Sequence, residues 1–181
     1  MSRLMRRFVR ETGGVSAVEF ALVLPLMLTL YLGSVEVSQA ISASRKVTLV
    51  SRAVADLTSQ ASTNITSADM TNMLNASSAI VSPFAASNLK VTVSCIAIDT
   101  TGNATVKWSE TLNGTKRTTN SQVSVNDALK VPNSWLLWSE AQYDYTPAIG
   151  YVITGTMTLK DQMYMSPRST TPASYNNIAC K

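Results

Sequence analysis

Residues 15–35 form an apolar run of about 21 residues, and this run constrains the chain more than any other feature. A helix of that length extends about 31 Å, which is enough to cross the hydrocarbon core of a bilayer. Glu19 is the only charged residue between Glu11 and Glu36. The run therefore predicts a transmembrane helix over residues 15–36, unless the segment is a cleaved signal.

The basic residues are concentrated ahead of this run. Residues 15–181 hold 11 Lys and Arg against 10 Asp and Glu, so this part is nearly neutral. The positive-inside rule then places the N-terminus in the cytoplasm, and the rest of the chain outside it. A nucleic-acid-binding protein carries a basic patch on its folded body, so no nucleic-acid partner is expected. The arginines of the leader are Arg3, Arg6, Arg7 and Arg10.

The chain has no histidine and only two cysteines. These absences exclude Ser-His-Asp and Cys-His catalytic arrangements, a His-ligated metal site and a zinc site built from cysteines alone. Carboxylates such as Asp144 and Asp161 carry no signature of an acid–base pair. We therefore expect no enzymatic activity, no metal, no cofactor and no small-molecule substrate.

Three interpretations of the apolar run differ in what they make of Glu19. The run is a conventional secretory signal if Ser38-Gln-Ala40 is the cleavage site, and the mature chain then starts near Ile41. It is a simple anchor if the helix tolerates Glu19. A carboxylate costs about 2.5–3.5 kcal/mol of insertion free energy at the centre of a membrane helix and less near its end. A third interpretation therefore assigns Glu19 a function that explains its presence in the apolar run.

That third interpretation rests on Gly14-Val-Ser-Ala-Val-Glu-Phe20. A glycine after a basic leader, followed by a Glu-Phe pair at the fifth and sixth positions, resembles the class III signal of type IV pilins. The resemblance implies cleavage by a prepilin peptidase between Gly14 and Val15. Cleavage leaves a positive α-amino group on Val15, one helical turn from Glu19. In low dielectric this ammonium and the Glu19 carboxylate of a neighbouring subunit attract, so the pair can set register in a filament.

The helical pattern continues beyond the membrane segment. Apolar residues recur with alternating spacings of three and four, which predicts an amphipathic extension over residues 37–62 within a helix from about 16 to 60. The stripe can pack on its own domain or form a coiled coil with another subunit. It consists of Ala40, Ala43, Val47, Val50, Val54, Leu57 and Ala61.

Residues 63–181 are expected to form an extracytoplasmic domain. A short second helix is predicted from Thr66 or Ser67 to about Val81, where Pro83 stops it. Its expected buried face is Met70, Met73, Leu74 and Ile80.

After residue 88 the period of the pattern changes to two. Strands are predicted over 89–98, 104–109, 140–146 and 151–165, with the odd-numbered residues of the first strand, from Leu89 to Cys95, on one face. Residues 135–138 are predicted to be a separate short apolar segment, and residues 166–181 an irregular tail. One long helix, one short helix and a mostly antiparallel four-stranded sheet define an α+β fold.

The two cysteines lie far apart in the sequence. Cys95 is on a predicted strand, and Cys180 is the penultimate residue. In an oxidising compartment they can pair, and closing a loop of about 85 residues stabilises the fold by about 4.5 kcal/mol. Two free thiols are the alternative. Trp135 and Trp138 are either buried anchors or a contact for a partner or the membrane interface.

Two blocks, residues 12–60 and 140–168, together resemble the TadE-like pseudopilins of the tight-adherence (Flp) pilus system. The first block holds the processing signal. The second holds Tyr143-Asp-Tyr-Thr-Pro147 and Met163-Tyr-Met-Ser-Pro-Arg168. TadF and TadG proteins share the first block. The resemblance implies a pilin-like architecture, with Gly14 and Val15 at the processing site and Glu19 and Phe20 as the Glu-aromatic pair.

The resemblance also implies a role and partners. The chain is expected to be a minor pilin or pseudopilin in the assembly of a type IVb pilus, with a structural role in adhesion. Its expected partners are the membrane, the prepilin peptidase, other pilins and an inner-membrane platform. The protein is then a single-pass bacterial inner-membrane protein with a periplasmic domain, which can enter an extracellular pilus. The alternative is a simple membrane-anchored or secreted binding domain.

Overall fold

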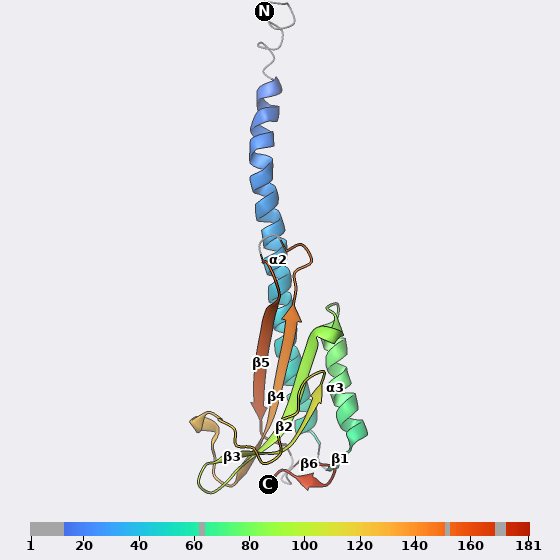
Figure 1. Cartoon of the computed structure of the whole chain (residues 1–181), viewed down its shortest axis with the longest axis vertical. Helices are drawn as coiled ribbons and strands as arrows, with labels where there is room; N and C mark the ends of the chain where they lie inside the picture. The colour runs from blue at the N-terminus through green and yellow to red at the C-terminus, as the bar shows by residue number, and fades with distance from the viewer. Residues whose placement is uncertain (1–12, 62–63, 151–152, 169–172) are drawn as a thin grey trace, which may run out of the picture. The chain divides into compact units, whose positions relative to one another are not determined.

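The computed structural model describes residues 13–61, 64–150, 153–168 and 173–181, and it has an α+β fold (Figure 1). The chain divides into two compact units. One consists of residues 1–40 and 146–155, and the other of residues 41–145 and 156–181. Residues 1–12 of the predicted leader, residues 1–14, lie outside the described residues.

Helix α2 (Gly13–Ser59) is 47 residues long and is continuous through Pro25. At helical rise it extends about 70 Å. The structure therefore confirms the long N-terminal helix predicted from residue 16 to about residue 60. Residues 13–40 of α2 belong to the first unit and residues 41–59 to the second.

The second part of α2 packs against the sheet through an apolar stripe. The stripe prediction is wrong at Leu57, which is 36% exposed, whereas Thr58 is fully buried. A strict 3.5-residue repeat drifts by about 20° per heptad around a 3.6-residue helix, so the buried face moves one position along. The predicted residues Ala40 and Ala61 are only partly buried, and Ala61 lies beyond the end of α2. The predicted residues that are buried are Ala43, Val47, Val50 and Val54.

Helix α3 (Ser67–Val81) is the predicted short helix. Thr66 is its N-cap and forms a capping box with Asp69: the Thr66 hydroxyl accepts from the Asp69 backbone N–H, and the Asp69 carboxylate accepts from the Thr66 backbone N–H. The predicted Met73 and Ile80 are only partly buried. The buried row is instead Met70, Leu74, Ser77 and Val81.

The main sheet has the order β3-β2-β4-β5, and every neighbouring pair is antiparallel. Its strands are β2 (Leu89–Ile98), β3 (Ala104–Leu112), β4 (Ser134–Tyr145) and β5 (Met157–Met165). The predicted four-stranded sheet is confirmed, but residues 135–138 belong to the first part of β4 and are not a separate apolar segment. Residues 136–139 of β4 are buried one after another, so both faces of the strand are covered there and the alternation that marks a strand is absent. β5 starts at Met157, and residues 151–152 of the predicted strand lie outside the described residues.

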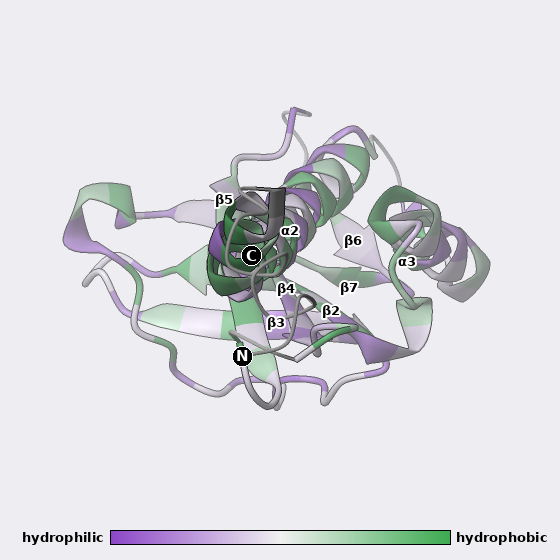
Figure 2. Cartoon of the chain, turned by 90° about the horizontal axis from the view of Figure 1, so that it is seen from above, coloured by the Kyte–Doolittle hydropathy of each residue, from purple (hydrophilic) through white to green (hydrophobic). Residues whose placement is uncertain are grey.

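The two faces of the main sheet are covered differently. Leu89, Val91, Val93 and Cys95 of β2 are all fully buried, as the period-two pattern predicted. Helix α3 and the second part of α2 lie on one side of the sheet (Figure 2). On another surface of the strands a second apolar cluster is covered by the loop after β3, through Val123, Val125 and Leu129. Its strand members are Ile96, Ile98, Ala104, Leu136 and Trp138.

The C-terminal tail is not irregular as predicted. It forms two short strands, β6 (Ser174–Tyr175) and β7 (Ile178–Ala179), which continue a small sheet from β1 (Asn64–Ile65) in the order β1-β6-β7. Strands of two residues are too short to leave a periodic pattern in the sequence, so the expectation was wrong for a physical reason.

Candidate functional site

The N-terminal part of α2 carries the predicted processing and assembly residues on an exposed helix. The side chains of Val15 and Phe20 are 58% and 61% exposed, and Glu19 is exposed as well. Val15 and Glu19 are four residues apart, so they lie on the same face about 6 Å apart along the axis. A Cβ added to Gly14 would meet no atom within 4 Å. Nothing within the described chain therefore requires a glycine at this position.

The same part of α2 exposes an unusual amount of apolar surface. Leu22 is 75% exposed and Leu30 is 65% exposed. The helix is long and apolar enough to cross a membrane by length and composition, and its most apolar stretch has no buried residue. Soluble monomers rarely expose contiguous apolar surface on this scale. This surface fits either lipid or other apolar helices.

Glu36 follows the apolar run directly and is only 2% exposed. Its Oε2 accepts a hydrogen bond of 2.9 Å from the backbone N–H of Ile153, which belongs to the connection between β4 and β5. The carboxylate therefore ties this connection to α2. Sequence reasoning assigned Glu36 no role. The available signal was a carboxylate placed between Val35 and Val37 at the end of an apolar run.

Arg168 holds the C-terminal end of α2. Its backbone N–H donates to the Ser59 carbonyl oxygen at 3.0 Å, and its guanidinium forms an ion pair with Asp56. Both contacts suit a helix C-terminus, where carbonyl groups lack helical donors and the dipole favours a cation. Part of the C-terminal block that carried the family resemblance thus has a structural task, which the sequence had not revealed.

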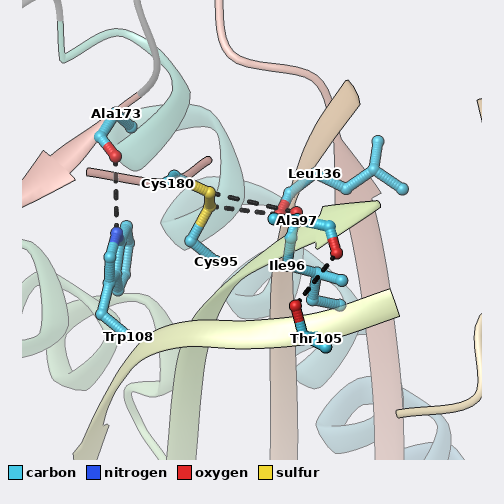
Figure 3. Close-up of a disulfide and its surroundings, with 8 residues drawn as sticks. All are labelled: Cys95, Ile96, Ala97, Thr105, Trp108, Leu136, Ala173 and Cys180. Carbon is cyan, nitrogen blue, oxygen red and sulfur yellow. Dashed lines mark hydrogen bonds between the residues drawn. A yellow bond between two sulfur atoms is a disulfide. The ribbon is translucent and has the colours of Figure 1, made fainter. Parts of the chain in front are cut away.

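The structure brings Cys95 and Cys180 together in a disulfide, with their Cα atoms 5.9 Å apart (Figure 3). Both residues are fully buried. The indole Nε1–H of the neighbouring Trp108 donates to the Ala173 carbonyl oxygen at 3.4 Å. These contacts fix the C-terminal tail to β2 and β3.

A polar cavity of about 920 Å³ lies on the sheet and is bordered by Lys90, Arg117 and Glu140 among others. Its charges are largely paired within the chain. Arg117 Nε and Nη2 donate to the two oxygens of Glu140 at 2.9 and 2.8 Å, and its guanidinium stacks 3.8 Å from the centre of the Trp138 ring. Lys90 pairs with Asp144 at 2.8 Å, and this hydrogen bond lowers the pKa of Asp144. In the described part of the chain, no three His, Cys, Asp or Glu residues gather as a metal site would need.

The fold and the exposed apolar helix define a pilin-like α+β protein. Residues 14–56 match the family model described as TadE-like protein, which confirms the resemblance over most of the first block, from Gly14 onward, and over most of α2. The second block, residues 140–168, lies outside the matched range. No curated protein and no solved structure matches the chain.

Proposed function

We propose that the protein is a minor pilin or pseudopilin of a tight-adherence pilus that is cut between Gly14 and Val15 by a prepilin peptidase. The observation that carries the proposal is the setting of Gly14. The glycine precedes an exposed apolar helix, and a side chain there would meet no atom of the chain. The chain itself would accept a side chain at this position, and a glycine there suits a partner that must approach the backbone closely, as a peptidase does.

The remaining parts of the chain follow from this processing. Residues 1–14 are the leader that is removed, residues 15–36 span the inner membrane, and residues 37–62 extend the helix into the periplasm. Residues 63–181 form the extracytoplasmic domain. The role is structural and not enzymatic, in adhesion and surface attachment. The partners are other pilins and an inner-membrane assembly platform, and the mature protein is either retained in the membrane or incorporated into the pilus.

Glu19 acts after cleavage in this proposal. A carboxylate in the apolar segment is costly unless a cation accompanies it. The new ammonium of Val15 on a neighbouring subunit lies near the same level of the helix, so the two charges offset each other's desolvation. Phe20 adds an exposed aromatic surface beside this pair.

The N-terminal sequence of the mature protein tests the processing step. We expect the mature protein to start at Val15. Gly14→Val should accumulate a precursor about 14 residues heavier in membrane fractions, because a side chain before the cut would keep the peptidase from approaching the backbone closely. Gly13→Val is the matched control and should mature normally. An intact N-terminus would instead support the simple anchor, and a start near Ile41 would support ordinary secretion.

Substitution of Glu19 tests the assembly step. Glu19→Ala should still insert and be cut, because it removes a charge from the membrane segment, while surface pili decrease. Glu19→Asp should be intermediate, because it keeps the charge but loses about 1.5 Å of reach. Mature protein and surface pili are measured in the same strain. Blocked cleavage of Glu19→Ala would place Glu19 in the peptidase signal, and normal pili would remove its structural role.

A further inference from the structure

The connection between β4 and β5, residues 146–156, has a composition unlike that of an ordinary surface turn. It contains no charged residue, and the nearest charges along the chain are Asp144 and Lys160. Ile149 is 50% exposed, and its neighbours Ala148 and Gly150 are exposed too. Surface connections are usually polar because their backbone and side chains face water. An exposed isoleucine in an uncharged connection is compatible with the interface of a membrane, where apolar side chains of surface segments enter the boundary between headgroups and acyl chains.

Glu36 fixes the level of this connection along α2. The backbone N–H of Ile153 donates to Glu36 Oε2, and both residues belong to the first compact unit. Glu36 is the first residue after the apolar run, one helical rise of about 1.5 Å beyond Val35. Where residues 15–35 span the hydrocarbon core, the connection is therefore held beside the point at which the helix leaves it.

The hydrogen bond also suits a site at this depth. A carboxylate and a backbone N–H are both costly to place near hydrocarbon without partners. In the structure each of them satisfies the other, and Glu36 is nearly completely buried. The apolar side chain of Ile149 is left exposed while these polar groups are satisfied within the protein.

We propose that the described residues of this connection, 146–150 and 153–156, rest in the interfacial region of the same membrane that α2 crosses, held there by Glu36. The protein then has a second contact with the periplasmic leaflet, which restrains the rotation of α2 about its axis. The occupant of this surface is the lipid interface, because the connection is uncharged, exposes an isoleucine and is tied to the end of the apolar run. The inference rests on the proposed function to the extent that residues 15–35 span the membrane.

The test uses the full chain in vesicles of phosphatidylethanolamine and phosphatidylglycerol. Single cysteines are introduced by Ile149→Cys, Thr100→Cys and Leu22→Cys and labelled with an environment-sensitive fluorophore without reductant, so that Cys95 and Cys180 stay bridged. Thr100 is the matched control because it is exposed in the turn after β2, at the end of the sheet opposite to Tyr145. Leu22 reports on the membrane span itself.

We expect shallow nitroxide lipids to quench the probe at position 149 at least about threefold more than the probe at position 100. The probe at position 22 should be quenched by deep nitroxide lipids. Quenching at 22 with equal, weak quenching at 149 and 100 overturns this inference and leaves the proposed span intact. A blue-shifted but unquenched probe at 149 means that protein, such as a second copy of the chain, covers the connection, which also overturns it. No quenching at 22 contradicts the span, and the inference falls with it.

Substitution of Glu36 tests how the connection is held. Glu36→Ala removes the acceptor and should reduce the quenching at position 149 about threefold, toward the value at position 100. Glu36→Gln keeps a side-chain oxygen that accepts from the Ile153 N–H, so it should retain most of the quenching. Unchanged quenching in Glu36→Ala would contradict the role assigned to Glu36.

Discussion

Helix α2 contains two segments whose surfaces differ completely. Residues 14–35 are exposed nearly all around, although most of them are large and apolar. Residues 41–59 bury one face in the domain and expose the other. A helix that is apolar on all sides needs apolar surroundings, whereas an apolar stripe needs only one packed surface. The first segment is therefore recognised by its total hydrophobicity, and the second by its periodicity.

The carboxylates along α2 extend this contrast. Asp56, in the segment that packs on the domain, pairs with the guanidinium of Arg168. Glu36, at the end of the apolar run, accepts a backbone N–H from Ile153. Glu19 lies exposed within the apolar segment. The first two carboxylates are held by partners from their own chain, and our proposal assigns the third to a partner from another subunit.

The largest expected effect comes from removing the disulfide, which belongs to the domain alone. Cys95→Ala with Cys180→Ala should lower the free energy of unfolding by about 4.5 kcal/mol, because the bridge closes a long loop of the unfolded chain. Urea unfolding of the full chain in detergent, followed by tryptophan fluorescence, measures it. The fraction of this double variant that inserts into the membrane should still be cut after Gly14. A loss below about 1 kcal/mol would show that the bridge adds little to the domain.

A matched pair of truncations compares the two segments of α2 directly. Val50→Ala removes two buried carbon atoms and should cost about 1.5–2.5 kcal/mol in the same unfolding measurement. Leu22→Ala removes more apolar volume from an exposed site and should change the unfolding of the domain by less than about 0.5 kcal/mol. Equal losses of unfolding free energy in the two variants would contradict the contrast between the two segments of α2.

The same contrast explains how far the sequence predicts the structure. The buried row of β2, from Leu89 to Cys95, repeats strictly every two residues, and its strand is predicted to the residue. The middle of the predicted α2 stripe, from Ala43 to Val54, is buried, but the prediction is wrong at Leu57, where the drift of a real helix exceeds what a regular spacing describes. The two ends of the predicted stripe, Ala40 and Ala61, are only partly buried. Local patterns are thus reliable where one face of an element decides its burial.

Long-range contacts leave no such pattern. The hydrogen bond between Glu36 and Ile153 joins residues 117 positions apart, and the ion pair between Asp56 and Arg168 joins residues 112 positions apart. Neither partner predicts the other from spacing or composition. The predicted processing motif around Gly14 can be recognised from the sequence because its parts are adjacent, whereas these long-range contacts can be identified only in the fold.

The contact at the end of α2 should have a smaller effect than the packing of its stripe. Arg168→Ala should lower the free energy of unfolding by up to about 1 kcal/mol, because ion pairs at the surface are largely screened by water. The backbone hydrogen bond to Ser59 remains in this variant. Arg168→Lys should recover part of the loss through its charge, although it lacks the planar guanidinium. The control is Arg52→Ala, at an exposed position of α2. A similar loss of unfolding free energy in that variant would contradict the role of Arg168 at the end of α2.

The smallest expected effect lies in the turn between β2 and β3, and it separates a pH-sensitive part of the domain from the apolar segment. The Asp99 carboxylate accepts from the Thr101 hydroxyl at 2.7 Å, the Asn103 backbone N–H at 2.9 Å and the Asn103 side-chain amide at 3.0 Å. These hydrogen bonds, the one from the Thr101 hydroxyl foremost, lower the pKa of Asp99 to about 2. Because the folded-state pKa lies below the unfolded value of about 3.9, the ionised carboxylate stabilises the fold above pH 4.

That contribution is lost as the pH falls from about 4 to about 2, so stability should decline with acid in this window. Asp99→Asn cannot ionise, and its unfolding free energy should decline less between pH 4 and pH 2 than that of the wild type. Thr100→Ala, in the same turn and without a titratable group, should keep the wild-type dependence. Urea unfolding of the full chain at the two pH values, followed by tryptophan fluorescence, measures the difference. Because the carboxylate is exposed to solvent, we expect a difference smaller than that for Arg168→Ala, and parallel pH profiles for Asp99→Asn and the wild type would contradict the assignment.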